Sequence, residues 1–181
     1  VSEAFKVTGA SGNTIETLDW KPAFDVYRQV VERHDGRSFD HTPFFDVAKA
    51  YPFGIAKYGA EMVVRDPLMI KEKSLVCVGR VPQESFVHIL HGSPESLIKA
   101  AGKARDLAYA SLRGAEPSAM IFIDCISRVL FLGTEFDREL QTVCLEGLPM
   151  VGALTIGEIA NCGHEFLEFY NKTSVVGLLS S

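Results

Sequence analysis

The chain has 181 residues, 47% of them hydrophobic and 23% charged, which is ordinary for a globular protein with a substantial core. Its net charge of −5 and the lack of a basic block exclude nucleic acid and anionic membrane as expected partners. No apolar run reaches the ~20 residues that span a bilayer. The chain begins with Val1 rather than Met and shows no signal peptide, so we expect it to be a piece of a larger protein.

The first part of the chain is predicted to form a hairpin and a helix. Residues 4–19 alternate apolar and polar side chains around a glycine-containing turn, which is typical of a β-hairpin. Pro22 is suited to the start of the following helix and Gly36 to its end. The polar stretch 35–43 then predicts a joint between two parts of the chain.

The middle of the chain is predicted to form a short helix and a set of short strands. The helix is expected at 44–50, before Pro52. The strand-like segments are separated by prolines and by a charged turn, which favours an antiparallel meander. These segments are 60–65, 74–79 and 85–90.

The second half is predicted to contain two long helices and several strands. Ser93-Pro94-Glu95 is a good helix start, and small residues then recur at helical spacing. A second helix is expected at 134–146, capped by Thr134 with Asp137 in the capping-box position. The strands are predicted at 120–123, 150–158, 165–171 and 173–179.

These elements together predict an α+β fold, with a mostly antiparallel sheet and an N-terminal hairpin and helix. We expect the helices at 94–113 and 134–146 to pack on one face of the sheet, because each carries an apolar stripe.

The sequence lacks several signatures of enzymes and cofactor sites. There is no phosphate-binding loop, no dinucleotide fingerprint, no GxSxG elbow and no HExxH motif. His88 and His91 are three residues apart on a predicted strand, so they point to opposite faces and are not expected to share a metal ion. The four cysteines form no CxxC pair, which is typical of free thiols in a reducing cytoplasm. We therefore expect no metal and no cofactor.

Two charged residues stand out beside strand-like sequence. Arg128 lies one turn beyond the predicted strand at 120–123, and its guanidinium is suited to a carboxylate or phosphate. Glu158 follows Gly157 in an apolar segment, where a carboxylate is costly to bury unless it is paired. Arg128 and Glu158 can therefore bind a ligand, or they can form an ion pair with each other.

Three further residues are candidates for the same site. Asn171 lies at a turn between strands, where its side chain can bind a ligand or hold the turn. Arg65 ends a strand and can line the same cleft. Cys125 lies where a strand meets a helix, which lowers a thiol's pKa, so it is either a nucleophile or part of a pocket wall.

Four motifs occur in order along the chain. They are Val64-Arg65-Asp66-Pro67-Leu68, Cys125-Ile-Ser-Arg128, Gly152 through Ile159, and Tyr170-Asn171-Lys172-Thr173. Their order and spacing resemble the C-terminal domain of the FIST sensory family. Phe5-Lys-Val-Thr8 and Lys21-Pro22-Ala23 resemble the tail of that family's N-terminal domain. On this basis we assign residues 1–36 to the tail of a preceding domain and residues 37–181 to the FIST C-terminal domain.

The resemblance implies a cytoplasmic ligand-sensing module of a signal transduction protein, without catalytic activity. Its partners would be a small molecule and an output protein or domain, such as a histidine kinase or chemoreceptor. The expected ligand is an amino acid or a similar polar metabolite. Arg128 would bind the carboxylate of this ligand and Glu158 its amine. Asn171 would fix the ligand's orientation by hydrogen bonds, with Arg65 and Cys125 beside these residues.

Three alternative functions remain open at this point. Some relatives resemble haem-based nitric oxide sensors, which would need a histidine as axial ligand. The domain can also be an interaction scaffold in which Arg128 and Glu158 only pair with each other. The third alternative is an enzyme that uses Cys125 as its nucleophile.

Overall fold

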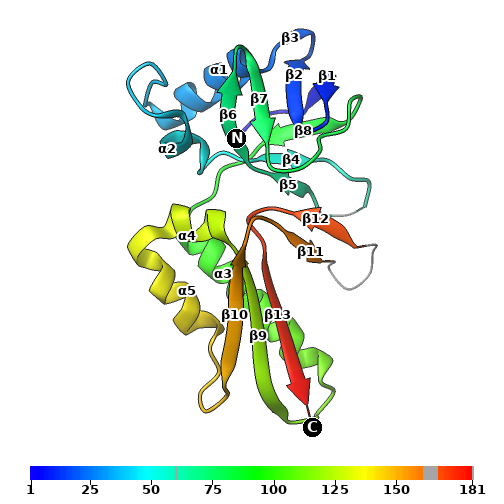
Figure 1. Cartoon of the computed structure of the whole chain (residues 1–181), viewed down its shortest axis with the longest axis vertical. Helices are drawn as coiled ribbons and strands as arrows, with labels where there is room; N and C mark the ends of the chain where they lie inside the picture. Colours follow the sequence, from blue (N-terminus) through cyan, green and yellow to red (C-terminus); the bar gives the residue numbers. More distant parts are fainter. Residues whose placement is uncertain (60, 161–166, 181) are drawn as a thin grey trace. The chain divides into compact units, whose positions relative to one another are not determined.

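The structure, a computed structural model, describes residues 1–59, 61–160 and 167–180 (Figure 1). The chain forms two compact units, unit 1 at Val1–Gly92 and unit 2 at Ser93–Ser181. Helices and mainly antiparallel strands are mixed in both units, which confirms the predicted α+β class. None of the described helices is long and apolar enough to cross a membrane.

Unit 1 is built on an antiparallel sheet in the order β5-β4-β8-β1-β2-β7-β6, with β3 paired to β2. Its helices are α1 (Ala23–Asp35) and α2 (Phe44–Ala48). Its strands are β1 (Phe5–Ser11), β2 (Thr14–Leu18), β3 (Lys21–Pro22), β4 (Phe53–Ile55), β5 (Val63–Arg65), β6 (Pro67–Lys71), β7 (Ser74–Cys77) and β8 (Phe86–Ile89).

The core of unit 1 forms where α1 packs against β2 and β7. Tyr27 of α1 is fully buried, and its hydroxyl donates to the backbone oxygen of Tyr51 at 2.8 Å. This bond satisfies the one polar group that the ring carries into the core. As predicted, α1 ends at Gly36, whose φ of 82° is a left-handed conformation that glycine adopts without strain.

Unit 2 contains a three-stranded sheet in the order β10-β9-β13 and a separate two-stranded hairpin. Its helical segments are α3 (Pro94–Ser111), α4 (Ile126–Leu132), the 3₁₀ turn η1 (Gly133–Glu135) and α5 (Phe136–Val143). Its strands are β9 (Pro117–Cys125), β10 (Met150–Thr155), β11 (Glu158–Ala160), β12 (Glu168–Tyr170) and β13 (Ser174–Ser180).

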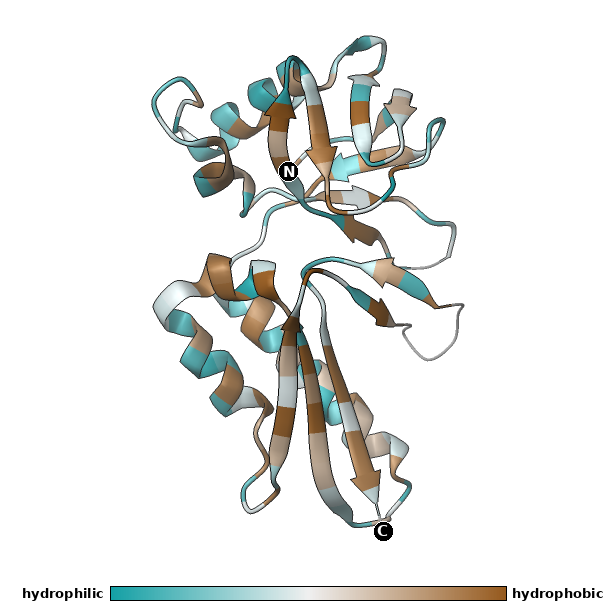
Figure 2. Ribbon diagram, viewed as in Figure 1, coloured by the Kyte–Doolittle hydropathy of each residue, from teal (hydrophilic) through white to brown (hydrophobic). Residues whose placement is uncertain are grey.

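The helices α3 and α5 cover one face of the three-stranded sheet, as the sequence predicted. The core between the two layers contains Ala101 from α3, Met120 and Phe122 from β9, and Val143 from α5. The apolar residues of β9, β10 and β13 appear as brown segments in Figure 2. Met120 and Phe122 point to the helices because alternate residues of a strand share a face.

The pairing of β9 with β10 is parallel, whereas β13 pairs with β9 in the antiparallel sense. A parallel pair needs a crossover connection, and α4, η1 and α5 provide it between the two strands. The crossover brings the C-terminal ends of β9 and β10 to the same end of the sheet. Ligands of parallel sheets commonly bind beyond the C-terminal ends of the strands.

Several details of the predicted elements differ from the structure. Thr134 does not cap α5: it lies inside the 3₁₀ turn η1, and Glu135 precedes α5 without a side-chain cap. The segment predicted as one strand at 150–158 is broken at Gly157 into β10 and β11. The strands β4 and β6 were not predicted. Part of the strand predicted at 165–171 lies outside the described residues.

The predicted domain boundary at residues 36/37 falls inside unit 1, directly after α1. The assignment of residues 1–36 to a preceding domain stays a prediction.

Candidate functional site

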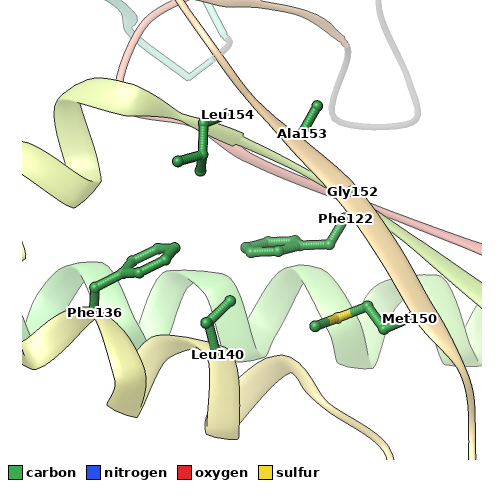
Figure 3. Close-up of a pocket in the computed structure, with 7 residues that line it drawn as sticks. All are labelled: Phe122, Phe136, Leu140, Met150, Gly152, Ala153 and Leu154. Carbon is green, nitrogen blue, oxygen red and sulfur yellow. The ribbon is translucent and has the colours of Figure 1, made fainter.

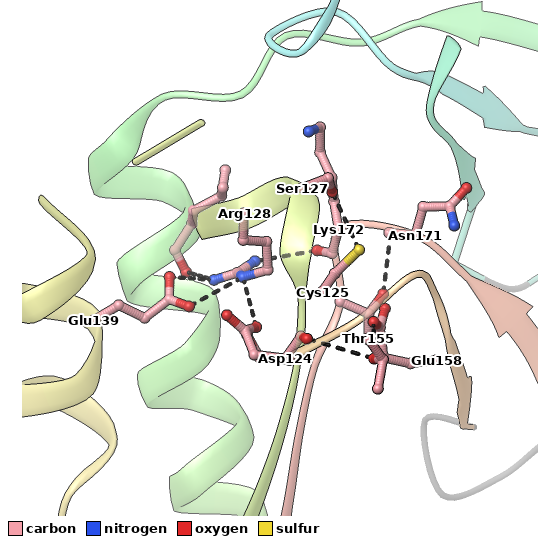
Figure 4. Close-up of polar contacts among 12 residues, drawn as sticks. Asp124, Cys125, Ser127, Arg128, Glu139, Thr155, Glu158, Asn171 and Lys172 are labelled. Atoms are coloured by element: carbon pink, nitrogen blue, oxygen red, sulfur yellow. Dashed lines mark hydrogen bonds and ion pairs between the residues drawn. The ribbon is translucent and has the colours of Figure 1, made fainter. Parts of the chain in front are cut away.

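The C-terminal ends of β9 and β10 form one end of the sheet in unit 2. Cys125, the last residue of β9, is paired in register with Thr155, the last residue of β10. The turn after Thr155 leads to Glu158 at the start of β11. Polar side chains from consecutive elements therefore meet at this end of the sheet (Figure 4).

Glu158 is a buried carboxyl group at this end of the sheet. It is 3% exposed, and the hydroxyl of Thr155 donates to its Oε1 at 2.7 Å. Its other oxygen, Oε2, has no hydrogen-bond partner among the described residues. Burial raises the pKa of Glu158 above its usual range; the Thr155 hydrogen bond opposes this effect most, followed by Cys125 and by the backbone of Thr173 and Gly157. Glu158 thus has one satisfied and one unsatisfied oxygen.

Cys125 lies beside Glu158 and is also buried. Its Sγ is 3.2 Å from the hydroxyl oxygen of Ser127. Burial raises the pKa of the Cys125 thiol above its usual value, and the nearby Glu158 carboxylate raises it further. The thiol is therefore the stable form near neutral pH, and the environment does not activate it as a nucleophile.

Asn171 packs against the turn that leads into Glu158. Gly157 has a φ of 110°, and a Cβ built there would lie 2.3 Å from the Phe169 ring and 3.0 Å from Asn171 Nδ2. Asn171 is 1% exposed, and its Nδ2 donates to the Tyr170 backbone oxygen at 3.2 Å. The glycine therefore lets the Asn171 amide approach the backbone next to Glu158.

Arg128 lies in α4 and is occupied by acceptors within unit 2. Its Nη2 donates to Glu139 Oε2 at 2.6 Å and to the Leu97 backbone oxygen at 2.8 Å. Its Nε lies 3.1 Å from Glu139 Oε1 and 3.1 Å from Asp124 Oδ1. Its Nη1 donates to the Lys172 backbone oxygen at 3.1 Å. The guanidinium is 2% exposed, and each of its nitrogens has an acceptor.

Asp124, Arg128 and Glu139 form a buried charge cluster with two carboxyl groups and one guanidinium. Ser174 donates to Asp124 Oδ1 at 2.7 Å. Burial raises the pKa of Asp124 to about 7; the Ser174 hydrogen bond and Arg128 oppose this effect, whereas Glu139 adds to it. Asp124 therefore stays protonated over a wider pH range than an ordinary aspartate.

Comparison with protein families gives one match, to the FIST C domain over residues 23–161. The chain belongs to the FIST C domain family. The FIST C domain is a sensory domain of signal transduction proteins and is not a catalytic family. Comparisons with curated proteins and with solved structures give no match.

The FIST C domain match includes most of the predicted site residues and extends over parts of both units. Cys125 and Glu158 lie together, with Asn171 against the turn before Glu158. Arg128 extends from α4 to Asp124 and Glu139, and no contact joins it to Glu158. If Arg128 has a structural role, its partners are therefore these two carboxyl groups, whereas the sequence suggested Glu158.

Arg65, the remaining predicted site residue, lies in unit 1 at the end of β5. Its side chain is 7% exposed, with Nε donating to the Arg80 backbone oxygen at 3.0 Å and Nη1 to the Val64 backbone oxygen at 2.9 Å. Its predicted place beside the unit 2 site stays a prediction.

Sequence reasoning missed three polar residues of this region in the FIST C domain. Asp124 follows Met120 and Phe122 at alternate positions of β9, so it shares their buried face. Glu139 lies three residues after Phe136 and four before Val143, within the buried stripe of α5. A carboxylate in each stripe was the signal of a buried ion-pair cluster. Thr155 gave no such signal.

The histidines of the FIST C domain form no metal site within the described ranges. The rings of His34 and His91 lie 4.9 Å apart, and His34 Nδ1 is 2.9 Å from the Tyr51 hydroxyl. Among the described residues, no group of three or more histidine, cysteine, aspartate or glutamate side chains is placed to hold a metal ion. Cys162 lies outside the described residues.

Proposed function

We propose that this sensory domain binds a small polar molecule that carries an amine, such as an amino acid, and that Glu158 is the anchor for the amine. The observation that carries the proposal is the buried Glu158 carboxyl group, whose Oε2 has no hydrogen-bond partner among the described residues. A buried polar atom without a partner costs about 1–3 kcal/mol, so a ligand that supplies a donor removes this cost.

The chemistry around Glu158 favours a cationic donor over an anion. Thr155 fixes Oε1 by a hydrogen bond at 2.7 Å, which leaves Oε2 as the oxygen for the ligand. An ammonium group would stabilise the ionised form of Glu158, whose pKa burial now raises. Asn171 would orient the ligand through its amide, and Cys125 would form part of the wall.

In this proposal Arg128 acts mainly by holding the end of β9 in place. It connects β9, through Asp124, to α5, through Glu139, and also binds the backbone of Leu97 and Lys172. To bind a ligand carboxylate, the guanidinium would have to exchange one of these acceptors for the ligand. The amine is therefore the essential group of the ligand, and the carboxylate is an additional one.

Ligand binding at Glu158 would favour one arrangement of the β10–β11 turn and so bias an attached output module. We propose a cytoplasmic histidine kinase or chemoreceptor as the kind of output protein, and no cofactor is part of the proposal.

Isothermal titration calorimetry of the full chain with amino acids, simple amines and simple carboxylates tests the proposal. Glu158→Gln should weaken amine binding by about tenfold or more, because a charge-assisted hydrogen bond contributes about 1.5–3 kcal/mol. Glu146→Gln, at an exposed carboxylate of the same unit, is the matched control and should leave binding unchanged. The proposal fails if no amine binds, or if carboxylates without an amine bind as tightly as amino acids.

A further inference from the structure

Unit 2 has an apolar hollow that is lined by none of the residues assigned to the ligand site. Its volume is about 220 Å³, and it lies between α5 and the edge strand β10. Phe136 and Leu140 of α5 face Met150 and Leu154 of β10 across it, with Phe122 of β9 at its base (Figure 3).

The strand β10 ends the sheet on this side, and among the described residues no strand pairs with its outer edge. The Met120 amide donates to the Pro149 oxygen at 2.9 Å, so the backbone of Pro149 faces β9. Backbone groups alternate in direction along a strand, so those of Met150, Gly152 and Leu154 face away from β9. The three residues with outward backbone groups are also three that line the hollow.

This edge lacks the features that usually protect an edge strand. Exposed edges are normally blocked by charged residues, by proline or by a bulge within the strand. The sequence of β10 is Met-Val-Gly-Ala-Leu-Thr, with no charge and no proline, and its pairing with β9 is regular. Val151 is 68% exposed and Leu154 is 49% exposed, so the edge is also apolar on both faces.

We propose that β10 is a docking edge for an extended segment of a partner protein, which adds a strand to the sheet and places alternate apolar side chains in the hollow. An added strand forms hydrogen bonds with the outward backbone groups of Met150, Gly152 and Leu154. Its alternate side chains contact Phe136 and Leu140. The inference is independent of the ligand proposed for Glu158.

The charges beside the hollow indicate what kind of segment fits. Asp137 follows Phe136 in α5, and Glu146 lies in the loop that leads to Met150. Both carboxylates are exposed, and neither forms an ion pair with a described residue. The segment that complements them has apolar side chains at every second position and a lysine or arginine at each end.

The same charges disfavour a second copy of this chain as the occupant. In an antiparallel pair of β10 strands, the Leu154 end of one copy lies beside the Met150 end of the other. Asp137 of one copy would then approach Glu146 of the other, and like charges repel. A strand of six residues is also only about 20 Å long, which is short for the ~1,200–2,000 Å² that a stable interface buries. A transient peptide contact fits this size.

The test uses the full chain and three synthetic peptides of eight residues. The first alternates valine and threonine between two terminal arginines; the second has terminal glutamates instead, and the third has a central proline. Fluorescence anisotropy should show that the first binds about tenfold more tightly than the other two. NMR hydrogen exchange should show that it protects the amides of Met150, Gly152 and Leu154.

Variants of the chain separate backbone pairing from side-chain packing. Leu154→Pro removes an outward N–H and should weaken binding by about tenfold. Leu154→Ala, the matched control, keeps the N–H and should weaken binding by only about threefold. Circular dichroism checks that both remain folded. Asp137→Lys should reverse the preference between arginine-ended and glutamate-ended peptides, and this result does not depend on the fold of the proline variant.

Two outcomes would overturn the proposal. One is that the arginine-ended peptide leaves the three outward amides unprotected or binds no better than the proline-containing peptide. The other is that the chain self-associates with rising concentration and protects the same amides without peptide, which would make a second copy the occupant.

Discussion

Replacing Arg128 with methionine should destabilise unit 2 by about 3–5 kcal/mol near neutral pH, because it leaves two buried carboxyl groups without their cation. Methionine keeps most of the apolar stem of the side chain, so the change mainly removes charge and hydrogen bonds. Arg128 is 2% exposed, and the side chains of Asp124 and Glu139 are both fully buried. Solvent therefore cannot replace the lost guanidinium.

The size of this effect depends on how many protons the remaining carboxyl groups take up. The pKa of Asp124 is already raised to about 7, so Asp124 can become neutral at little cost when Arg128 is lost. Glu139 then carries the uncompensated charge. One uncompensated buried charge rather than two places the loss toward the lower end of the range near neutral pH.

Native-state hydrogen exchange of the Met120 and Phe122 amides in β9 measures this local stability. The double variant Arg128→Met/Glu139→Gln removes the uncompensated charge and should recover about half of the loss. Lys103→Met, at an exposed cation on α3, is the control for a lost surface charge and should change stability by less than about 0.5 kcal/mol.

A different result would refute the structural role of Arg128. If Arg128→Met costs less than about 1 kcal/mol and Glu139→Gln does not compensate, the guanidinium is not needed to neutralise the cluster. If amino acid binding is lost at the same time, Arg128 is a ligand residue as the sequence first suggested.

Three further predictions follow from the same region. The raised pKa of Asp124, about 7, means that its contribution to stability is present below about pH 4 and lost as pH rises through 7; Asp124→Asn should flatten this decline in chemical unfolding scans. Gly157→Ala should destabilise the β11–β12 hairpin by about 2–3 kcal/mol and weaken ligand binding in calorimetry, because its Cβ would meet the Phe169 ring at 2.3 Å. Mass spectrometry after brief iodoacetamide treatment should find the exposed Cys144 modified well before the buried Cys125; rapid modification of Cys125 would revive a catalytic role.

Local sequence signals predicted most helices and the longer strands of the fold. The helix start at Ser93 is confirmed in detail, since its side chain accepts from the Ser96 amide in a capping box. The strand β6 was missed because Pro67 was interpreted as a turn residue. Pro67 is the first residue of β6, and β6 is an edge strand, where a missing N–H costs little. The parallel pairing of β9 and β10 depends on packing that periodicity does not report.

Sequence patterns pointed to candidate site residues but not to the contacts that these residues make. Glu158 was identified because a carboxylate in an apolar strand needs a partner, and the structure gives that idea a specific unsatisfied oxygen. The partners of Arg128 were not identified, because Glu139 is eleven residues away along the chain and reaches Arg128 only when α5 folds back over the sheet. Such contacts depend on tertiary structure, which a single sequence does not display.

The arrangement around β9 has a consequence for how the chain folds. The central strand β9 pairs with β13, in which Ser174 meets Asp124, and Arg128 binds the Lys172 oxygen 44 positions later in the chain. Contacts between such distant segments slow folding, because a long loop must close before they form. During synthesis the contacts of the charge cluster with Lys172 and Ser174 cannot form until β13 has left the ribosome, so unit 2 should fold only after β13 has been translated. Pulse proteolysis can compare chains arrested before residue 174 with chains that include β13. Only the chains with β13 should show protection of unit 2.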